Sequence, residues 1–467
     1  MTPARLTRFA LAAALTLAAC GGDESNAAEL QGVWLAEAYG SVLEVREDEV
    51  RSYELTSAHC LLADVDGPFD AAYVALGEGG TTLRERIARH GAMQQGPLHR
   101  RIDALPERCA EGQRLPLAGE AGYARDARAD FELVVDTFRE LYVGFEPRGV
   151  DWDAHAAEVR ATLSDAPTDE EMLLALLALI EPLEDSHVAI AAGDDEYGYY
   201  RGPTLVERLT DAWVSENGPI TNDAAYAAYV EATGAALAEI AALRESYAAG
   251  PVGRDRSGTM KWFRTADDLG VLLVDGMSGY GGSEDLEADL DAVEAALEDA
   301  FAALAGVRGM VVDVRSNGGG YDAVSQLIAR RFLDRERMLY TKEARLGDGF
   351  DARDEIRLAP TANAFTGPVV VLTSRATVSA AEVFTMMMRE LPHVTLVGEA
   401  TQGALSDVLS RTLPGGFGFD LANEAYRTPS GEWFEGPGIP PDVVAEHGID
   451  RSHDAGLERA LARLAGG

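Results

Sequence analysis

The sequence predicts an α/β fold with a mainly parallel sheet in the C-terminal half of the chain. Four short apolar runs are typical of buried strands: "LGVLLVDGM" (269–277), "RGMVVDVRS" (308–316), "GPVVVLTS" (367–374) and "HVTLVGE" (393–399). The segment "EADLDAVEAALEDAFAALA" (287–305) carries apolar residues at helical spacing between two of them. Alternation of strands and helices indicates parallel strands that are covered by helices.

The remaining segments predict further structural units around this core. The pattern "GVWLAEAYGSVLEVREDEV" alternates apolar and polar residues, so we expect a small β-rich domain over 30–119. Residues 127–200 are expected to be mainly helical, because "TDEEMLLALLALIEPL" begins with a Thr-x-x-Glu cap and continues as an apolar helix. A second helical stretch occupies 201–262, the α/β core 265–447, and a terminal helix 453–467.

The charge balance disfavours two classes of partner. Among 467 residues, 78 are acidic and 40 are basic, which gives a formal charge of −38. Such a surface repels nucleic acid and anionic lipid, so we expect no nucleic-acid partner. No H-E-x-x-H or calcium-loop spacing is present, and we expect neither a metal nor another cofactor. Lys261 and Lys342 are the only lysines, which limits the use of lysine as a catalytic base.

The N-terminus has the pattern of an export signal. Arg5 and Arg8 precede the apolar run "FALAAALTLAAC", which is too short to span a bilayer. The run ends in Leu-Ala-Ala-Cys at Cys20, which resembles the lipobox of bacterial lipoproteins. Residues 1–19 would then be the signal peptide, Cys20 the acylated residue and 20–29 a tether. This predicts a lipid-anchored protein of the bacterial cell envelope, on the outer membrane facing the periplasm. A soluble secretory signal with an accidental cysteine is the alternative.

Two further cysteines suggest a disulfide. Cys60 and Cys109 form an even pair in a protein that is expected to be exported to an oxidising compartment. Closing a loop of about 50 residues would stabilise the fold by roughly 4 kcal/mol in the chain-entropy model. A metal site would need more ligands than His59 supplies nearby.

The stretch "LTSRATVSAAEVFTMMMREL" (372–391) allows two interpretations of Ser379. With Glu382 it forms S-x-x-E, which is an ordinary capping box at the start of a helix. Alternatively, Ser379 is a nucleophile at a helix N-terminus, where backbone N–H groups can bind an oxyanion. This stretch by itself favours the capping box.

Other loops supply candidate partners for a nucleophilic serine. "DVRSNGGGYD" (313–322) places three glycines after a strand, where the backbone can approach a ligand or simply make a tight turn. "EGPGIPPDVV" (435–444) is a stiff loop that begins with a carboxylate. The G-x-S-x-G elbow is absent, and neither lysine lies in a loop suited to a site. His187 in "LEDSHVAI" is therefore the candidate base, although a lone histidine is more often structural.

The ordered motifs "LEDSH", "DVRSNGGG", "TVSAAE", "GEATQG" and "FEGPGIPPDV" resemble the tail-specific, or C-terminal processing, serine proteases. The resemblance covers about 127–200 and 265–447 and is strongest to the branch of the tricorn core protease and the interphotoreceptor retinoid-binding protein repeats. It implies a ClpP/crotonase-like protease core with an N-terminal helical region. The helical stretch 201–262 stands where processing proteases carry a PDZ domain.

The resemblance also implies roles for individual residues. Ser379 would be the nucleophile, His187 the general base, and Glu435, through the hydroxyl of Ser186, the group that orients the imidazole. Ala404 stands where the processing-protease branch has its catalytic lysine, so this sequence fits the histidine-using branch.

The oxyanion would be bound by the N–H of Ala380 and that of Gly318 or Gly319, in keeping with the chemistry of such sites.

These observations predict a cell-envelope serine peptidase that hydrolyses peptides or unfolded protein through an acyl-enzyme. One alternative is a non-catalytic module that binds a hydrophobic ligand or peptide on the same fold, since fold does not determine function. The other is a hydrolase of a different acyl substrate, such as an ester or lactam, with the same triad.

Overall fold

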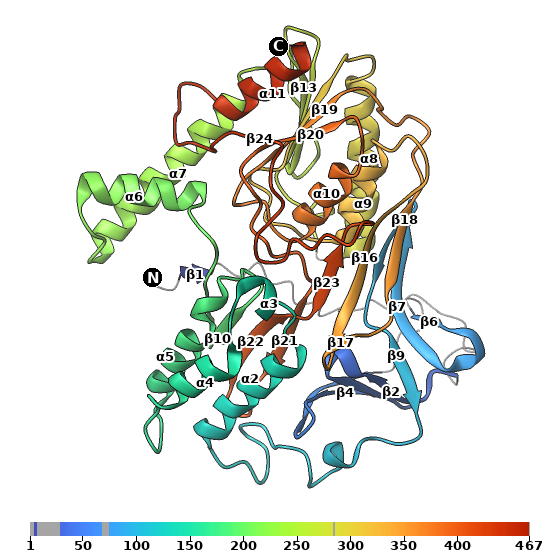
Figure 1. The fold of residues 1–467 in the computed structure, drawn as a ribbon, viewed down its shortest axis with the longest axis vertical. Coiled ribbons are helices and arrows are strands. Elements are labelled where there is room, and N and C mark those ends of the chain that lie inside the picture. The colour runs from blue at the N-terminus through green and yellow to red at the C-terminus, as the bar shows by residue number, and fades with distance from the viewer. Residues whose placement is uncertain (1–3, 7–28, 68–73, 284, 467) are drawn as a thin grey trace.

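The computed structural model describes residues 4–6, 29–67, 74–283 and 285–466. Figure 1 shows the α/β core at the top, a helical region and a β-rich domain below it, and a helical hairpin that projects to one side. Cys20 and most of the predicted signal peptide lie outside the described residues. Within those residues, no helix has the length and apolar character needed to cross a membrane.

A seven-stranded sheet forms the centre of the core, in the order β12-β13-β14-β15-β19-β20-β24. Its strands are β12 (Gly253–Arg254), β13 (Met260–Arg264), β14 (Gly270–Val274), β15 (Met310–Asp313), β19 (Val369–Thr373), β20 (Val394–Gly398) and β24 (Val443–Val444). The strands from β14 to β24 are parallel, whereas β12 and β13 pair antiparallel at one edge. The predicted α/β fold with a mainly parallel sheet is confirmed.

Helices cover both faces of this sheet. One face carries α8 (Leu286–Ala303), α9 (Asp322–Arg330) and α10 (Ala380–Arg389), and the other carries α11 (Ala455–Ala465). In β19, alternate residues enter the two layers: Val371 joins the α10 side and Leu372 the α11 side. Both faces are buried, which is why the strands are continuous apolar runs in the sequence.

Two smaller sheets connect the core to the helical region. β16 (Arg337–Leu346), β17 (Gly349–Phe350), β18 (Asp354–Leu358) and β23 (Glu424–Arg427) form one of them. The other has the order β1-β11-β10-β22-β21 and comprises β1 (Ala4–Leu6), β10 (Ala189–Ala192), β11 (Asp195–Gly198), β21 (Val408–Thr412) and β22 (Phe417–Ala422). β10, which begins two residues after His187, therefore pairs with a strand from the C-terminal half.

The helical region consists of α2 (Ala127–Leu141), α3 (Phe145–Arg148), α4 (Trp152–Arg160), α5 (Asp169–Ile180) and the short 3-10 helix η5 (Glu181–Leu183). Its interior is aromatic: Phe138 stacks on Trp152 and on Phe419 of β22. α5 begins at a complete capping box in which Thr168 and Glu171 each bond the other's backbone N–H, as the sequence predicted. The region and the two-stranded arm β21–β22 consequently share one apolar core.

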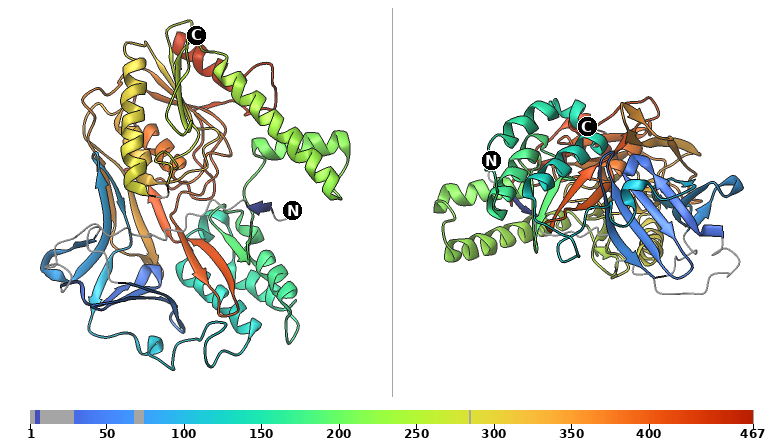
Figure 2. Two further views of the ribbon diagram at one scale, coloured as in Figure 1. Left: turned by 180° about the vertical axis from the view of Figure 1, so that it is seen from behind. Right: turned by 90° about the horizontal axis from the view of Figure 1, so that it is seen from below.

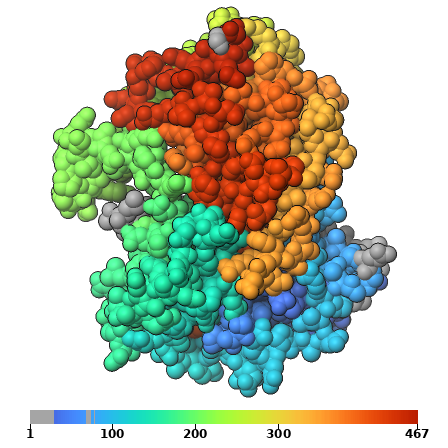
Figure 3. All heavy atoms as spheres, viewed as in Figure 1, coloured from blue at the N-terminus to red at the C-terminus, as the bar shows by residue number. Residues whose placement is uncertain are grey.

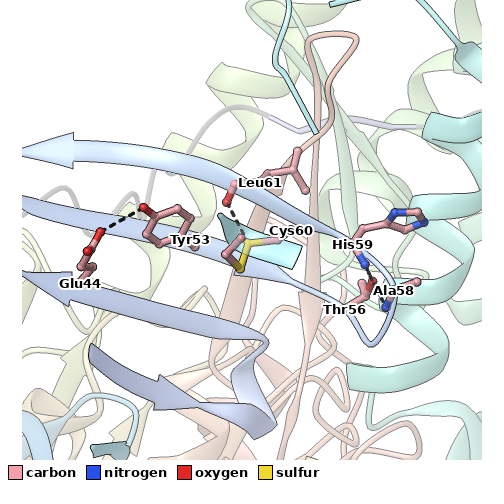
Figure 4. The surroundings of a disulfide bond; sticks show 8 residues. Glu44, Tyr53, Thr56, Ala58, His59, Cys60 and Leu61 are labelled. Carbon is pink, nitrogen blue, oxygen red and sulfur yellow. Dashed lines mark hydrogen bonds between the residues drawn. A yellow bond between two sulfur atoms is a disulfide. The ribbon is translucent and has the colours of Figure 1, made fainter. Parts of the chain in front are cut away.

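The N-terminal domain is an eight-stranded antiparallel sheet. Its strands are β2 (Gly32–Ala36), β3 (Ser41–Val45), β4 (Val50–Leu55), β5 (Cys60–Asp66), β6 (Val74–Leu76), β7 (Thr82–Arg89), β8 (Ala92–Gln95) and β9 (His99–Ile102), with 3-10 turns η1 (Glu37–Tyr39), η3 (Glu78–Gly80) and η4 (Glu107–Cys109). The predicted disulfide between Cys60 and Cys109 is present, with an S–S distance of 2.05 Å and both cysteines buried. Figure 4 shows this bond beside the strands.

The helical stretch after residue 201 forms a hairpin of α6 (Leu205–Asn217) and α7 (Asp223–Glu245). A small apolar cluster holds the two helices together. The hairpin projects away from the core in the ribbon views and in the space-filling view (Figures 1, 2 and 3).

Candidate active site

Ser379 lies between β19 and α10, and its backbone is unusual for a residue with a side chain. Its φ is 58° and its ψ −128°, a region that favours glycine because a Cβ crowds the backbone there. Ser379 occupies the N-cap position of α10, yet its side chain makes no capping hydrogen bond. The carboxylate of Glu382 instead accepts hydrogen bonds from the N–H groups of Gly403 and Ala404, both at 2.8 Å. The capping-box interpretation is wrong, because the hydroxyl of Ser379 does not cap the helix.

This backbone strain can be measured. We expect Ser379→Gly to be more stable than Ser379→Ala by about 1 kcal/mol, because glycine removes a strain of about 1–3 kcal/mol and loses about 0.5–1 kcal/mol to its unfolded-state entropy. Denaturant-induced unfolding of both variants measures the difference. Ser283, an exposed serine without positive φ, is the control. There the glycine variant should be no more stable than the alanine variant, and equal behaviour at both sites would contradict the strain.

The glycine loop after β15 lies directly against Ser379. A Cβ added to Gly319 would be 2.6 Å from the Cβ of Ser379, so only glycine fits at this approach. The N–H of Gly319 donates to Oδ1 of Asn317 at 2.9 Å. In the described part of the chain, the N–H groups of Gly318 and Ala380 have no hydrogen-bond acceptor. Of the three predicted oxyanion donors, Gly318 and Ala380 therefore keep an uncommitted N–H and Gly319 does not.

His187 lies in the turn between η5 and β10. Its backbone N–H donates to Oδ1 of Asp185 at 3.0 Å, and Asp185 also accepts from the hydroxyl of Tyr142 at 2.8 Å. The side chain is buried, and within the described residues neither its Nδ1 nor Oγ of Ser186 has a hydrogen-bond partner. This turn therefore holds a fixed histidine whose ring still has hydrogen-bonding capacity.

Burial keeps the imidazole of His187 neutral at neutral pH. Burial lowers the pKa of His187 and outweighs Asp185, Asp407 and Asp420, which raise it, while Arg148 lowers it further. A neutral imidazole can accept a proton, and nearby carboxylates would stabilise the imidazolium that forms.

Glu435 is fully buried and contacts other groups than those expected. Its Oε1 lies 3.0 Å from Nη2 of Arg148, and its Oε2 accepts from the N–H of Leu405 at 3.0 Å. Burial raises the pKa of Glu435 to about 8, and Arg148 opposes that shift. The predicted contact between Glu435 and Ser186 is not formed in this structure, because Oγ of Ser186 has no partner among the described residues.

The loop of residues 401–407 contacts both halves of the predicted site. The N–H of Ser379 donates to the carbonyl of Ala404 at 3.0 Å. On the other side, Arg148 donates to the carbonyl of Gly403 at 2.8 Å, and the carboxylate of Asp407 interacts electrostatically with His187. Ser379 thus contacts this loop directly, whereas His187 interacts with it through the charge of Asp407.

Neither lysine is suited to act as a base. Lys342 is buried, with Nζ 3.1 Å from Asp407 and 3.2 Å from Glu424. Burial would lower the pKa of Lys342, but these carboxylates raise it well above its usual value, so the amine stays protonated. Lys261 pairs with Glu245 at 3.3 Å and with Asp275 at 3.8 Å.

Several contacts of this site have no local sequence signal. Arg148 ends the short helix α3 within "FEPRG", a segment that carries no recognisable motif. Glu382 was recognised only as half of a capping box, although its actual partners lie about twenty residues further on.

The described residues also contain no group of three or more His, Cys, Asp or Glu that could hold a metal ion.

Comparison with known proteins assigns the core. Residues 268–445 match the family model described as peptidase family S41. The core of the chain therefore carries a peptidase family S41 domain, the family of the tail-specific proteases. Among curated S41 relatives, the carboxy-terminal processing protease CtpA of Bacillus subtilis is 30% identical over 30% of this chain and 29% of its own length. The chloroplastic C-terminal processing peptidase of Tetradesmus obliquus is 31% identical over 36% and 35%, respectively.

The match to these S41 relatives is partial, since the chain aligns with about a third of the length of each. Among solved structures, a candidate peptidase from Parabacteroides merdae superimposes with a TM-score of 0.57 at 24% identity, over 73% of this chain and 97% of the other. At that identity the likeness supports the fold. Processing proteases and a tricorn protease are both among the relatives, and the branch that includes the retinoid-binding protein repeats is not confirmed.

Proposed function

We propose that this protein is a serine peptidase that cleaves peptide bonds through an acyl-enzyme on Ser379. The observation that carries the proposal is the turn at Ser379, where a strained backbone leaves the hydroxyl uncommitted at a helix N-terminus. Uncommitted N–H groups of Gly318 and Ala380 belong to the segments on either side. Relatives named as processing proteases support a peptide or protein substrate.

In this proposal His187 is the general base. Its neutral imidazole takes the proton from Oγ of Ser379 as the oxygen attacks the carbonyl carbon of the substrate. The same proton then passes to the leaving amine as the C–N bond breaks and the acyl-enzyme remains. Water, deprotonated by His187, hydrolyses the ester and restores the free serine. The carboxylates that interact with His187 support this role by stabilising the imidazolium.

The N–H groups of Gly318 and Ala380 would bind the oxyanion of the tetrahedral intermediate. Losing one such donor typically lowers the rate about 10²–10³-fold. Gly319 contributes by its close approach to Ser379 instead, because its own N–H is bonded to Asn317. Glu435 would orient the site through its contacts with Arg148 and with the N–H of Leu405. When substrate binds, it would also act through the hydroxyl of Ser186.

We further propose that the protein acts in the bacterial cell envelope, anchored to the outer membrane by a lipid on Cys20. The disulfide between Cys60 and Cys109 supports export, since disulfides persist in oxidising compartments. The arginine-flanked apolar run before Cys20 supports the same route.

A fluorophosphonate probe tests the proposed function. We expect one covalent adduct, located on Ser379 by peptide mass spectrometry, and cleavage of unstructured peptides that the probe blocks. Absence of both on folded protein would reject the peptidase and favour a binding module on the same fold. Turnover of esters without any turnover of amides would instead assign a hydrolase of another acyl substrate.

A further inference from the structure

The guanidinium of Arg148 lies at the joint between the helical region and the core. Its side chain is only 5% exposed. Nη2 lies 3.0 Å from Oδ2 of Asp185 and 3.0 Å from Oε1 of Glu435, and it donates to the carbonyl oxygen of Gly403 at 2.8 Å. One nitrogen thus contacts three segments that are far apart in the sequence.

Each of these contacts leads to a residue of the proposed site. Asp185 accepts the backbone N–H of His187 and is held from the other side by Tyr142. Gly403 precedes Ala404, whose carbonyl accepts the N–H of Ser379. Arg148 therefore connects the turn that carries the base to the loop that contacts the nucleophile.

The charges of the groups at this joint explain why an arginine is needed there. Asp185 and Glu435 are both buried, and Asp185 adds to the rise in the pKa of Glu435 that burial causes. The single guanidinium lies between them, opposes that rise and contacts both carboxyl groups, so it joins the two segments. A neutral side chain of similar length would fill the space but would leave Asp185 without this counter-ion and would raise the pKa of Glu435 further.

Several buried polar atoms at the same joint have no hydrogen-bond partner. Among the described residues, four buried polar atoms near Asp185 and Glu435 have no partner: Nε and Nη1 of Arg148, Oγ of Ser186 and Nδ1 of His187. Catalytic hydrogen bonds in free enzymes are often incomplete and form only when substrate is bound. These four atoms can therefore form further hydrogen bonds when substrate binds, with groups that are already at the joint.

We propose that Arg148 is a positioning residue that sets the place of His187 relative to Ser379. It does so by binding Asp185 on the helical side and Glu435 and Gly403 on the core side. The role rests on the proposed function of Ser379 and His187, but the geometry that it requires can be measured separately.

The first test separates positioning from stability. Arg148→Met is compared with Arg148→Met/Asp185→Asn, in which one of the two unbalanced carboxylates is also neutralised. Arg331→Met is the control, since Arg331 is equally buried at 5% exposure and pairs with Glu294 away from Ser379. Fluorophosphonate labelling is measured per folded molecule, well below the melting temperature of each variant.

We expect Arg148→Met to label at least about 10-fold more slowly than the unmodified protein. The double variant should regain thermal stability but keep the slow labelling, and Arg331→Met should label at the normal rate. Recovery of both stability and labelling in the double variant would overturn the proposal, because Arg148 would then only balance a charge.

A pH profile gives a readout that a purely structural role would not change. The charged groups that interact with His187 are Asp185, Asp407 and Asp420, which raise its pKa, and Arg148, which lowers it. Loss of Arg148 should therefore move the acidic limb of the labelling profile to higher pH. An unshifted limb in Arg148→Met would count against the proposal.

Hydrogen–deuterium exchange tests the geometry independently of activity. We expect faster exchange over residues 184–190 in Arg148→Met/Asp185→Asn and unchanged exchange there in Arg331→Met. If the unmodified protein does not react with the probe, the proposed function fails while this measurement still decides the positioning role. Unchanged exchange over 184–190 in the double variant would overturn that role.

Discussion

Replacement of His187 by alanine is expected to slow acylation of Ser379 by at least about 10³-fold, as losses of a general base in serine hydrolases do. The hydroxyl of Ser379 is a weak nucleophile without a base, and the protonated Lys342 cannot replace the imidazole. Stopped-flow labelling with a fluorophosphonate probe measures the effect. Burial lowers the pKa of His187, so the unmodified enzyme should keep its activity below neutral pH until the imidazole is protonated.

His155→Ala is the matched control for this prediction. His155 lies on α4 in the same helical region and is half-buried, and its ring bonds the carbonyl of Ala178. The control should retain full activity, and both alanine variants should unfold within about 1–2 kcal/mol of the unmodified protein. Activity that survives in folded His187→Ala would show that the base lies elsewhere.

Arg315→Met is expected to lower the free energy of unfolding by about 3–5 kcal/mol, because it leaves buried carboxylates without their counter-ion. The guanidinium of Arg315 lies 2.7 Å from Asp313 at the end of β15 and 2.7 Å from Asp454 at the N-cap of α11. Burial by itself would raise the pKa of Asp313, but Arg315 lowers it below its usual value. Arg315 thus connects β15 to the terminal helix through two ion pairs.

Denaturant-induced unfolding followed by circular dichroism measures this loss. Arg451→Met is the control, since Arg451 pairs with Glu239 while both side chains are more than half exposed. Exposed pairs contribute about 0–1 kcal/mol, so the control should change stability little. A loss below about 1 kcal/mol for Arg315→Met would show that Arg244, 3.7 Å from Asp313, is a sufficient counter-ion.

Local patterns predicted the elements of the core well. Strands covered on both faces must be apolar along their length, so runs such as Val369–Thr373 were recognisable without any tertiary information. The Thr168 capping box and the disulfide of Cys60 and Cys109 were likewise present in the sequence as short patterns. The strands from 74 to 102 were predicted only as part of the β-rich domain 30–119 and not one by one, because charged residues occupy much of that segment and obscure the alternation.

A short pattern gave a wrong prediction at Ser379, where S-x-x-E suggested a capping box. S-x-x-E is satisfied by residue types alone, whereas capping also requires the N-cap backbone to be extended. The positive φ of Ser379 turns its side chain away from that role, and Glu382 bonds the loop at Gly403 and Ala404. Only coordinates could distinguish the two interpretations, because the positive φ of Ser379 has no signal in the residue types of the motif.

By itself, the sequence determined the α/β core, the family motifs and the residue types available for catalysis, because buried strands and tight turns restrict composition locally. The tertiary structure decided what these residues contact. Pairing of β10 with β22 brings the turn of His187 to the C-terminal half, and Arg148 meets Asp185, Gly403 and Glu435 across gaps of up to 287 residues. Such contacts depend on how distant segments pack together, and no local spacing in the sequence encodes them.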